Sequence, residues 1–510
     1  MITEILNEYT YDAECAGLSY SLSTTTVGLR LVLKGYNHKM PVLLQAVLDA
    51  MVSLNATTLN EERYVSIKQR KKLAWENFNK SVPYQHCSYN STYLLQNTRW
   101  HLLEKIQAID SPGTSSDQLF HHASRLFQTM TMECLIMGNM NEIDANDMAI
   151  MVSKTLQLST PFNGSIHRGR GVQLLSENSS ATTATSTTAT TATSSTTATS
   201  VTTATSSTTA TSSTTATTST PLSTSSSCPT NYLHRMIHPD PNQENSAIEI
   251  TFQVGPLSIR NEAILRLLMH LMKAPCFATL RTTEQLGYTV WSGVTESPCG
   301  ILSIWFIVQS KDYGPAYLDT RIEHFLEVFR NDTLPTYNDI DNIDDISDID
   351  NTNDTDADTG NKSNLANQKN DKLNLLSSFE TNKEACISKW SEKDKTLQQR
   401  SSRFRSALSS NKSEYEFNAR FDRAEVLHNQ NITLDNVIEC FDQYLFNKSK
   451  ERKKLSCQVV SSTHLKEDDA LIDTNAERIG TSVNAMNDWK ASKLLFPSVL
   501  TRPVENVANL

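Results

Sequence analysis

The 510-residue sequence lacks a basic excess, paired cysteines and a secretory leader. Its 46 Lys and Arg face 56 Asp and Glu, and this balance argues against a general binder of nucleic acid or of an anionic membrane surface. The nine cysteines are scattered, odd in number and without a C-x-x-C pair, which favours a reducing compartment. The opening MITEILNEYTYDAE has no basic and apolar leader, and no apolar run of transmembrane length is evident. We therefore expect a cytoplasmic protein.

The net charge of −10 belongs to one segment. Ten aspartates lie between Asp332 and Asp358 with no Glu, Lys or Arg, so the rest of the chain is neutral and its charge predicts no substrate. Residues 331–371 are rich in Asp and Asn, and 46 of the 49 residues in 179–227 are Ser, Thr or Ala. Neither segment has enough apolar side chains to build a core, so we expect two disordered insertions. Deleting 331–371 is expected to leave the fold intact.

No motif in the sequence predicts a metal site or a nucleotide site. The pattern H-x-x-E occurs at His101 and His324, but Lys105 and Val328 stand where H-x-x-E-H has its second histidine. We expect both patterns to be ordinary helix-surface residues. His234 and His238 are expected in a loop before a strand, without a third ligand. The stretch Asp354–Gly360 resembles the start of a calcium loop but lacks the required Gly and Glu, so calcium binding is not predicted.

Apolar periodicity predicts alternating helices and strands on both sides of the Ser/Thr/Ala tract. Before the tract we expect helices over 2–13, 41–52 and 61–80, and strands over 27–34 and 134–137, the latter ending in a turn at Gly138. After it we expect strands over 247–254, 301–309 and 455–461, and helices over 261–273 and 433–446. This order predicts the α+β class, with two similar domains that each pack helices on an antiparallel-rich sheet.

The most distinctive stretch is R-T-T-E-Q-L-G-Y at 281–288. Pro275 is predicted to start a helix, and Gly287 to end it in the left-handed conformation that glycine adopts easily. Arg281 and Tyr288 would then form a pair of donors suited to a carbonyl, a carboxylate or a developing oxyanion. The alternative is that Arg281 pairs with Glu284 and that Tyr288 is a core residue. The residues alone leave both interpretations open.

Several segments resemble the insulin-degrading enzyme family of pitrilysin-type zinc metallopeptidases. R-T-x-E-Q-L-G-Y is a hallmark of that family's fourth domain, and 6–20, 34–37, 83–86 and Gly138-Asn139 are similar to its third domain. Leu495-Phe496-Pro497 resembles its C-terminal segment. The resemblance implies the pitrilysin and processing-peptidase fold. It places an N-terminally truncated third domain at 1–178, a linker at 179–227, the fourth domain at 228–330 and 372–510, and the acidic insertion between them.

The resemblance also implies a division of labour. The family's zinc site, H-x-x-E-H with a distal glutamate, lies in an N-terminal half that this chain lacks, so no catalytic residue, metal ligand or cofactor is expected here. Arg281 and Tyr288 are the expected substrate-binding residues. The expected partners are peptide substrates and an N-terminal catalytic half, in the same polypeptide or a separate one. A homodimer is allowed, whereas nucleic acid and membrane are not expected.

Two alternatives to that role remain open. The chain could be a pseudopeptidase that binds or scaffolds peptides for a separate catalytic chain, or a decayed product without function. Cytoplasm is the default location, and mitochondrial and peroxisomal addresses stay open. The chain ends in Ala508-Asn509-Leu510, whereas relatives often end in a peroxisome-like A-K-L.

Overall fold

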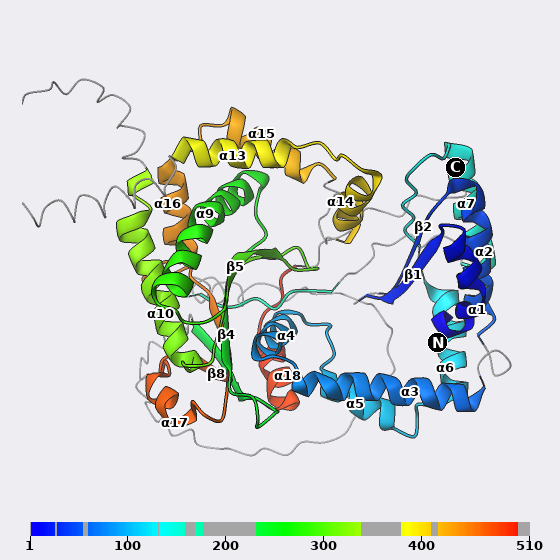
Figure 1. The fold of residues 1–510 in the computed structure, drawn as a ribbon, viewed down its shortest axis with the longest axis horizontal. Coiled ribbons are helices and arrows are strands. Elements are labelled where there is room, and N and C mark those ends of the chain that lie inside the picture. The colour runs from blue at the N-terminus through cyan, green and yellow to red at the C-terminus, as the bar shows by residue number, and fades with distance from the viewer. Residues whose placement is uncertain are drawn as a thin grey trace, which may run out of the picture.

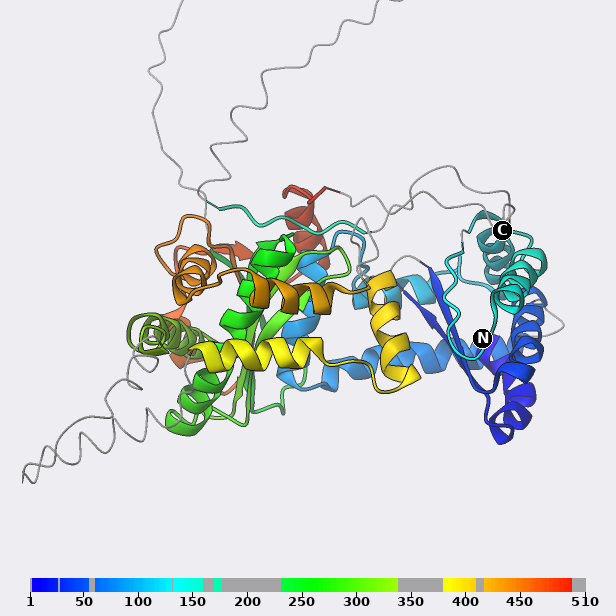
Figure 2. The ribbon, with the colours of Figure 1, turned by 90° about the horizontal axis from the view of Figure 1, so that it is seen from above.

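The computed structural model describes residues 2–25, 28–54, 60–130, 132–158, 169–176, 231–337, 379–409 and 417–497 (Figure 1). The Ser/Thr/Ala tract, the stretch Asp354–Gly360 and most of the acidic segment lie outside these residues, so the two expected insertions are not tested there. The described chain forms a smaller N-terminal body and a larger body around a six-stranded sheet, and α3 and α5 extend between them (Figures 1 and 2).

The smaller body packs helices against a two-stranded antiparallel sheet. Its elements are α1 (Ile2–Cys15), β1 (Ser19–Thr24), β2 (Leu29–Lys34), α2 (Met40–Val52), α6 (Ser116–Thr129) and α7 (Glu142–Thr155). Leu6, Val47, Leu48 and Met148 are buried in its core. The helices predicted over 2–13 and 41–52 are confirmed, and the predicted strand is confirmed from Leu29 onward.

The strand predicted over 134–137 is wrong. In the described chain of this body, β1 and β2 pair only with each other, so the segment has no ladder to join. Ile136 packs against the core while Leu135 is exposed. The segment is therefore an extended chain in which one side chain packs on the core and its neighbour points to solvent. Gly138 has a φ of +139°, as a turn after this segment requires.

The larger body contains a six-stranded sheet in the order β5-β6-β4-β7-β3-β8. Its strands are β3 (Asn231–Ile237), β4 (Ser246–Gly255), β5 (Thr289–Glu296), β6 (Leu302–Ser310), β7 (Lys454–Val460) and β8 (Glu477–Ile479). The four strands from β5 to β7 are antiparallel neighbours, while β7, β3 and β8 run parallel. The strands predicted over 247–254, 301–309 and 455–461 are confirmed.

Helices cover both faces of this sheet. One face packs against α9 (Ile259–Phe277), α10 (Pro315–Val328) and α16 (Leu434–Tyr444), and the other against α4 (Pro83–Leu95) and α18 (Val483–Ala491). The central strand β4 is therefore buried along its whole length. Its apolar side chains Ile250 and Phe252 face the first group of helices. Its polar Thr251 faces α4, where its hydroxyl lies 3.1 Å from that of Ser91.

Segments that precede the tract belong to this larger body. Helix α4 lies between α3 (Glu61–Glu76) and α5 (Leu102–Asp110) in the chain, yet its Cys87 and Tyr93 pack beneath the sheet. Residues 169–176 lie beside it, and Gln253 of β4 fixes them by accepting from the Leu174 amide and donating to the Val172 carbonyl, each at 2.8 Å. Packing therefore crosses residue 178, where the sequence predicts a domain boundary.

The acidic segment begins later than the sequence predicts. The first residues of the segment, 331–333, belong to the π-helical turn η4 (Phe329–Thr333). The next four, 334–337, follow this turn, and Leu334 and Tyr337 are buried in the core of the larger body. The expectation that 331–371 can be deleted without harm is therefore wrong at its first seven residues, because the deletion would leave a cavity. The remaining helices are α13 (Phe379–Ser391), α14 (Leu397–Ser409), α15 (Ala419–Asn429) and the short α17 (Leu465–Asp468).

Helix α9 corrects another expectation. Within the described residues, one helical stretch, Ile259–Thr283, is long and apolar enough by composition to cross a membrane. Most of its apolar side chains are buried between the sheet and the neighbouring helices, as Leu265 and Leu268 illustrate. The composition is that of a core helix, which passes the same test.

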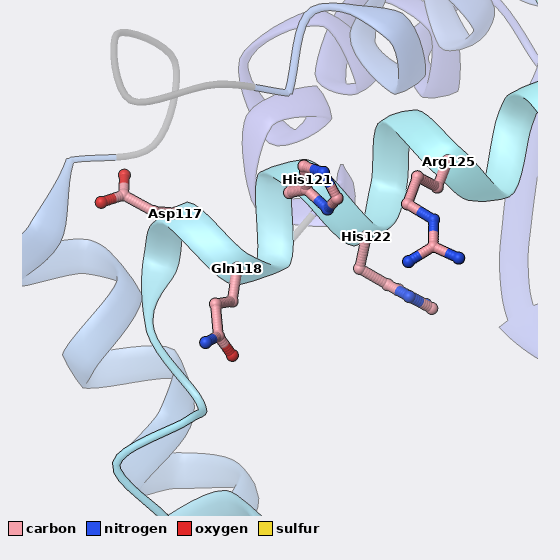
Figure 3. Close-up of a pocket in the computed structure, with 5 residues that line it drawn as sticks. All are labelled: Asp117, Gln118, His121, His122 and Arg125. Carbon is pink, nitrogen blue, oxygen red and sulfur yellow. The ribbon is translucent and has the colours of Figure 1, made fainter.

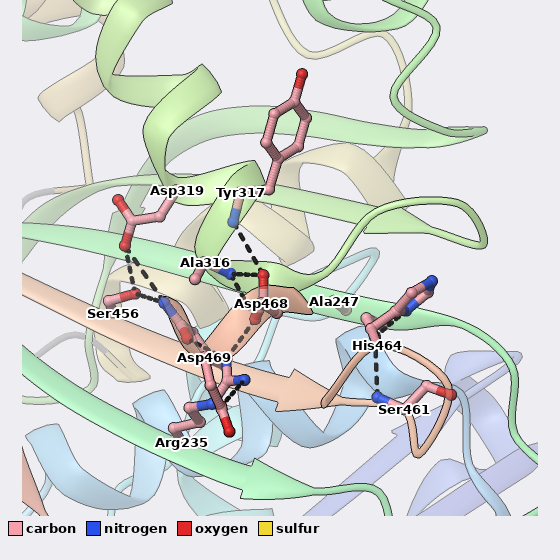
Figure 4. Close-up of polar contacts among 12 residues, drawn as sticks. Arg235, Ala247, Ala316, Tyr317, Asp319, Ser456, Ser461, His464, Asp468 and Asp469 are labelled. Carbon is pink, nitrogen blue, oxygen red and sulfur yellow. Dashed lines mark hydrogen bonds and ion pairs between the residues drawn. The ribbon is translucent and has the colours of Figure 1, made fainter. Parts of the chain in front are cut away.

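Two carboxylates, buried Asp468 and partly buried Asp319, fix α10 to the sheet (Figure 4). The Asp468 carboxylate accepts from the backbone N–H groups of Ala316 at 2.9 Å and Tyr317 at 3.1 Å, and from Arg235 of β3 at 2.6 Å. It thus satisfies free donors at the start of α10 from a distant part of the chain. One turn further on, Asp319 accepts from Ser456 of β7 at 2.9 Å.

Candidate functional site

Helix α9 leads directly into the predicted substrate-binding motif. Pro275 lies inside this helix and does not start it, contrary to the prediction. A proline removes the N–H that would bond the carbonyl four residues earlier, which is that of Leu271. The Tyr337 hydroxyl donates to this carbonyl at 3.1 Å and replaces the lost bond. The helix therefore continues to Phe277 and then widens into the π-helical turn η3 (Ala278–Thr283), a type of turn frequent at functional sites.

The loop after the π-helical turn differs from the prediction in which residue is left-handed. Gln285 has a φ of +53°, whereas Gly287 is not in that region. A Cβ at position 287 would lie 2.0 Å from the Gln309 carbonyl oxygen, so glycine is required by close backbone approach to β6. A left-handed glutamine is unusual and indicates that the surrounding structure holds this loop in one conformation.

The structure brings Arg281 and Tyr288 together. The guanidinium carbon of Arg281 lies 5.9 Å from the centroid of the Tyr288 ring and 4.8 Å from that of Phe277. Tyr288 is 90% exposed, which rules out the alternative that it is a core residue. Within the described chain, neither polar head group has a hydrogen-bonding partner. Phe277, 42% exposed, was missed from the sequence, although its position four residues before Arg281 places it on the same helix face.

The other alternative, a pair between Arg281 and Glu284, is also wrong. Glu284 binds Arg321 of α10 through two parallel hydrogen bonds of 2.7 and 2.8 Å. This bidentate pair is partly buried and ties the end of the π-helical turn to the neighbouring helix. Among the described residues Arg281 is therefore without a hydrogen-bonding partner, and the loop that carries Tyr288 is fixed by Glu284 before Gln285 and by Gly287 after it.

Removing the ion pair of Glu284 and Arg321, called the clamp below, should destabilise the loop that carries Tyr288. We expect Glu284→Ala to lower the free energy of unfolding by about 1–3 kcal/mol, because Arg321 would lose both charged hydrogen bonds. Urea unfolding measures the loss, and amide hydrogen exchange should accelerate at residues 284–288. Glu327→Ala is a matched control on the exposed face of α10 and should change stability by less than about 0.5 kcal/mol. Equal effects of the two variants would contradict the clamp.

The histidines do not form a metal centre. His238 lies directly after β3 and is buried; its Nε2 is 2.9 Å from the Ser81 carbonyl, and its Nδ1 is 3.1 Å from the Asp240 amide nitrogen. His234 lies within β3, so the predicted loop is wrong for it. Figure 3 shows a pocket along α6 that includes His121 and His122, but these neighbours project to different sides. In the described ranges no three His, Cys, Asp or Glu residues lie close enough to hold a metal ion, so these residues do not fit zinc.

One of the two H-x-x-E patterns has a structural role. His101 is the N-cap of α5 and accepts from the Leu103 amide at 3.2 Å, while Glu104 accepts from the His101 amide at 2.6 Å. The pattern is thus a capping box, and the predicted surface position is wrong for His101, which is buried. Burial lowers the pKa of His101 to about 4. His324 of α10 is exposed, as predicted.

Comparison with known proteins identifies the fold. Residues 1–108 match the family model of the middle or third domain of peptidase M16, and residues 267–341 match that of the PQQ synthase PqqF-like C-terminal lobe domain 4. The crystal structure of pitrilysin aligns with 98% of the chain at a TM-score of 0.67 and 15% identity, and 41% of that structure is covered. The chain has the pitrilysin-like M16 fold, and the predicted α+β class is confirmed.

Sequence relatives narrow the class. The insulin-degrading enzyme of Drosophila melanogaster is 25% identical over 504 residues, which cover 98% of this chain and 41% of that protein. A putative zinc protease of Schizosaccharomyces pombe is 27% identical over 338 residues, which cover 66% of this chain and 28% of that protein. The chain is thus similar to an insulin-degrading enzyme over almost its whole length and to the M16 middle or third domain over its first 108 residues. It spans about two fifths of the length of the first of these relatives.

Proposed function

We propose that this chain is the non-catalytic, substrate-holding part of a zinc metalloendopeptidase, with Arg281 and Tyr288 as its peptide-binding residues. The observation that supports the proposal most strongly is the pairing of a guanidinium that has no hydrogen-bonding partner among the described residues with a phenol that is 90% exposed, on a loop held by the ion pair of Glu284 and Arg321. The names of its relatives supply the reaction class, because they include an insulin-degrading enzyme and a putative zinc protease.

The chemistry of the pair suits a peptide carbonyl. Arg281 has N–H donors in a planar fork, and the Tyr288 hydroxyl is a second donor, so two directions of approach converge on one oxygen. The rings of Phe277 and Tyr288 flank the guanidinium and limit the rotamers that it can adopt. Donors held in this way can orient a scissile carbonyl and stabilise the negative charge that develops on its oxygen.

The proposal is tested with the purified 510-residue chain. We expect it to bind a fluorescent peptide whose termini carry no label. It should not hydrolyse this peptide, because the described residues do not fit a catalytic metal. Fluorescence anisotropy measures binding, and chelator-sensitive cleavage of a fluorogenic peptide measures activity. Arg281→Ala should weaken binding, whereas Arg260→Ala, at the exposed start of the same helix, should not. Chelator-sensitive hydrolysis by the purified chain would contradict the non-catalytic role.

A chimera tests the catalytic context. In the chimera, this chain replaces the aligned stretch of the Drosophila insulin-degrading enzyme. The rest of that enzyme is kept unchanged. Insulin degradation by the chimera, lowered by Arg281→Ala, is the expected result. Peptide binding by the chain together with a chimera that folds but does not degrade insulin would favour the alternative role, a binding or scaffolding subunit.

A further inference from the structure

Strand β5 is an edge of the six-stranded sheet and starts at the proposed peptide-binding residues. Tyr288 immediately precedes it, and among the described strands β5 pairs only with β6. Its other edge thus presents backbone N–H and C=O groups without a strand partner. An extended peptide that is held at Tyr288 can continue along this edge and pair with it through main-chain hydrogen bonds.

An exposed tryptophan lies on this edge, three residues after Tyr288. Trp291 is 46% exposed, whereas its neighbours Val290 and Ser292 are buried. Val290 packs in the core beneath α9, so the alternation of side chains along a strand places Trp291 on the other face of the sheet, which packs against α4. Tryptophan is usually well buried, so its exposure beside an open edge indicates a contact surface.

The start of α4 supports the ring of Trp291. The ring of Tyr84 meets it edge-on, with ring centroids 5.1 Å apart and an angle of 80° between the ring planes. The Tyr84 amide in turn donates to the side-chain carbonyl of Gln309 on β6 at 3.2 Å. The indole is therefore held from one side by α4, and Trp291 still has nearly half of its surface open to solvent.

A glycine extends this aromatic region along the strand. Gly293 lies two residues after Trp291 and therefore on the same face of the sheet. A Cβ at position 293 would lie 3.0 Å from the ring of Trp305, which is opposite Gly293 on β6 and partly exposed. Without a side chain at 293, the Trp305 ring lies close to the β5 backbone. Trp291, Trp305 and Tyr84 together form what we call the aromatic surface.

We propose that Trp291 is a specificity-determining residue, which selects peptides with an aromatic side chain three positions from the residue beside Tyr288. Residues directly opposite each other on paired strands point to the same face, with Cβ atoms about 5 Å apart. The peptide residue opposite Trp291 therefore points its side chain at the aromatic surface. A ring there makes the edge-to-face or offset-stacked contacts that aromatic pairs prefer.

The spacing and the occupant follow from the strand. Three positions along a strand span about 10 Å at about 3.4 Å per residue, so one extended peptide reaches both Tyr288 and Trp291. Either direction of the added strand satisfies this spacing, because it is a distance along the peptide. The occupant is the peptide itself, since the aromatic surface continues the proposed binding site along the same strand. The inference rests on the proposed function of Arg281 and Tyr288 and adds a substrate preference to it.

The test uses the full chain and fluorescent undecapeptides that differ only at their central residue. We expect the peptide with a central Phe to bind about two- to tenfold more tightly than the version with Leu, because an aromatic pair contributes beyond the area that it buries. Trp291→Val keeps a strand-forming residue and should abolish the difference, whereas Trp291→Phe keeps a ring and should retain most of it. Trp100→Val, at a tryptophan that is 69% exposed before α5, should preserve the full preference.

Shorter peptides test the spacing. The residues that flank the central Phe are removed stepwise from both ends. We expect a steep fall in affinity when fewer than three remain on each side, because the peptide then no longer reaches Trp291 and Tyr288 together. In Trp291→Val the affinity should fall only gradually, since one of the two contacts is already absent. Peptides shortened on one side alone show the direction of the bound strand.

A photoreactive ring locates the contact without altering the protein. Benzoylphenylalanine in place of the central Phe should attach, on illumination, to β5, to β6 or to the start of α4. Mass spectrometry of the digested chain identifies the labelled segment. Labelling confined to other segments would overturn the placement of the ring at Trp291.

The outcomes separate the two proposals. Equal binding of the Phe and Leu peptides to the unmodified chain, or an unchanged preference in Trp291→Val, overturns the aromatic preference alone. A gradual fall with peptide length in both proteins overturns the spacing. A folded Trp291→Val chain that binds every peptide normally but gives a chimera that does not fold would assign the aromatic surface to a contact with the rest of the enzyme and overturn the preference. If Arg281→Ala binds every peptide as the unmodified chain does, the proposed function itself fails, whatever Trp291 does.

Discussion

Replacing Arg281 by alanine is expected to lower kcat/KM of the chimera by about 2–4 kcal/mol of transition-state stabilisation, or about 30- to 1,000-fold. The variant removes a fork of donors whose N–H groups have no partner within the described chain, so no internal network has to rearrange. Weaker peptide binding should raise KM, and the larger part of the loss should fall on kcat, because the donors interact most strongly with charge that develops during the reaction. Initial rates over a range of peptide concentrations separate kcat from KM.

Two variants control this result. Arg281→Lys keeps the charge but not the planar fork, so it should restore only part of the rate. Tyr288→Phe removes one donor, keeps the ring beside the guanidinium and should cost less than Arg281→Ala. An unchanged kcat in Arg281→Ala would remove the proposed role, and a fall in kcat accompanied by unfolding would show that the residue acts through the fold.

Replacing Lys454 by methionine is expected to lower the free energy of unfolding by about 3–5 kcal/mol, because it would leave the partly buried Asp319 without a cation and Glu323 with Arg452 alone. Lys454 is 5% exposed, and its ammonium contacts Asp319 and lies 2.6 Å from Glu323, both on α10. The ion pairs thus join β7 to the helix that also supplies Arg321 to the clamp. Urea unfolding at neutral pH measures the change, and Lys450→Met, on the surface, is the matched control.

The same cluster predicts a pH dependence with a defined sign. Burial opposes ionisation of Glu323, but the charges of Lys454 and Arg452 outweigh it and lower its pKa from 4.5 to about 2. A depressed carboxyl pKa contributes stability that is complete above about pH 4.5 and is lost as the pH falls toward 2. The fall between these pH values should be shallower in Lys454→Met. Identical pH profiles of the two proteins would show that Lys454 does not hold Glu323 ionised.

Local pattern predicted most elements, because a helix or strand with one buried face has a periodicity that a sequence displays directly. Helix α2 and strands β4 and β7 are examples. The predictions were wrong where a residue distant in the sequence determines the local conformation. Pro275 is tolerated in α9 because Tyr337, 62 positions later, caps the carbonyl that it leaves free. Gly287 is fixed by the Gln309 carbonyl, which no feature near 287 reveals.

The candidate site was partly predictable for the same reason. Arg281 and Tyr288 stand in one motif, so their proximity follows from a short loop. The partner of Glu284 could not be predicted, because Arg321 lies 37 positions away on another helix, whereas Arg281 lies three positions away in the same motif.

The two ends of the Ser/Thr/Ala tract are anchored almost at one point. The Leu175 amide donates to the Tyr232 hydroxyl at 3.2 Å, and both residues belong to structure fixed on the six-stranded sheet. For a segment without structure of its own, as the composition of the tract predicts, each doubling of loop length costs only about 0.6 kcal/mol. Repeat expansion between Ser176 and Asn231 is therefore nearly neutral for folding, and a backbone nick there would leave two fragments held together by the sheet. Variants that lengthen or shorten the tract are therefore expected to have nearly the same free energy of unfolding.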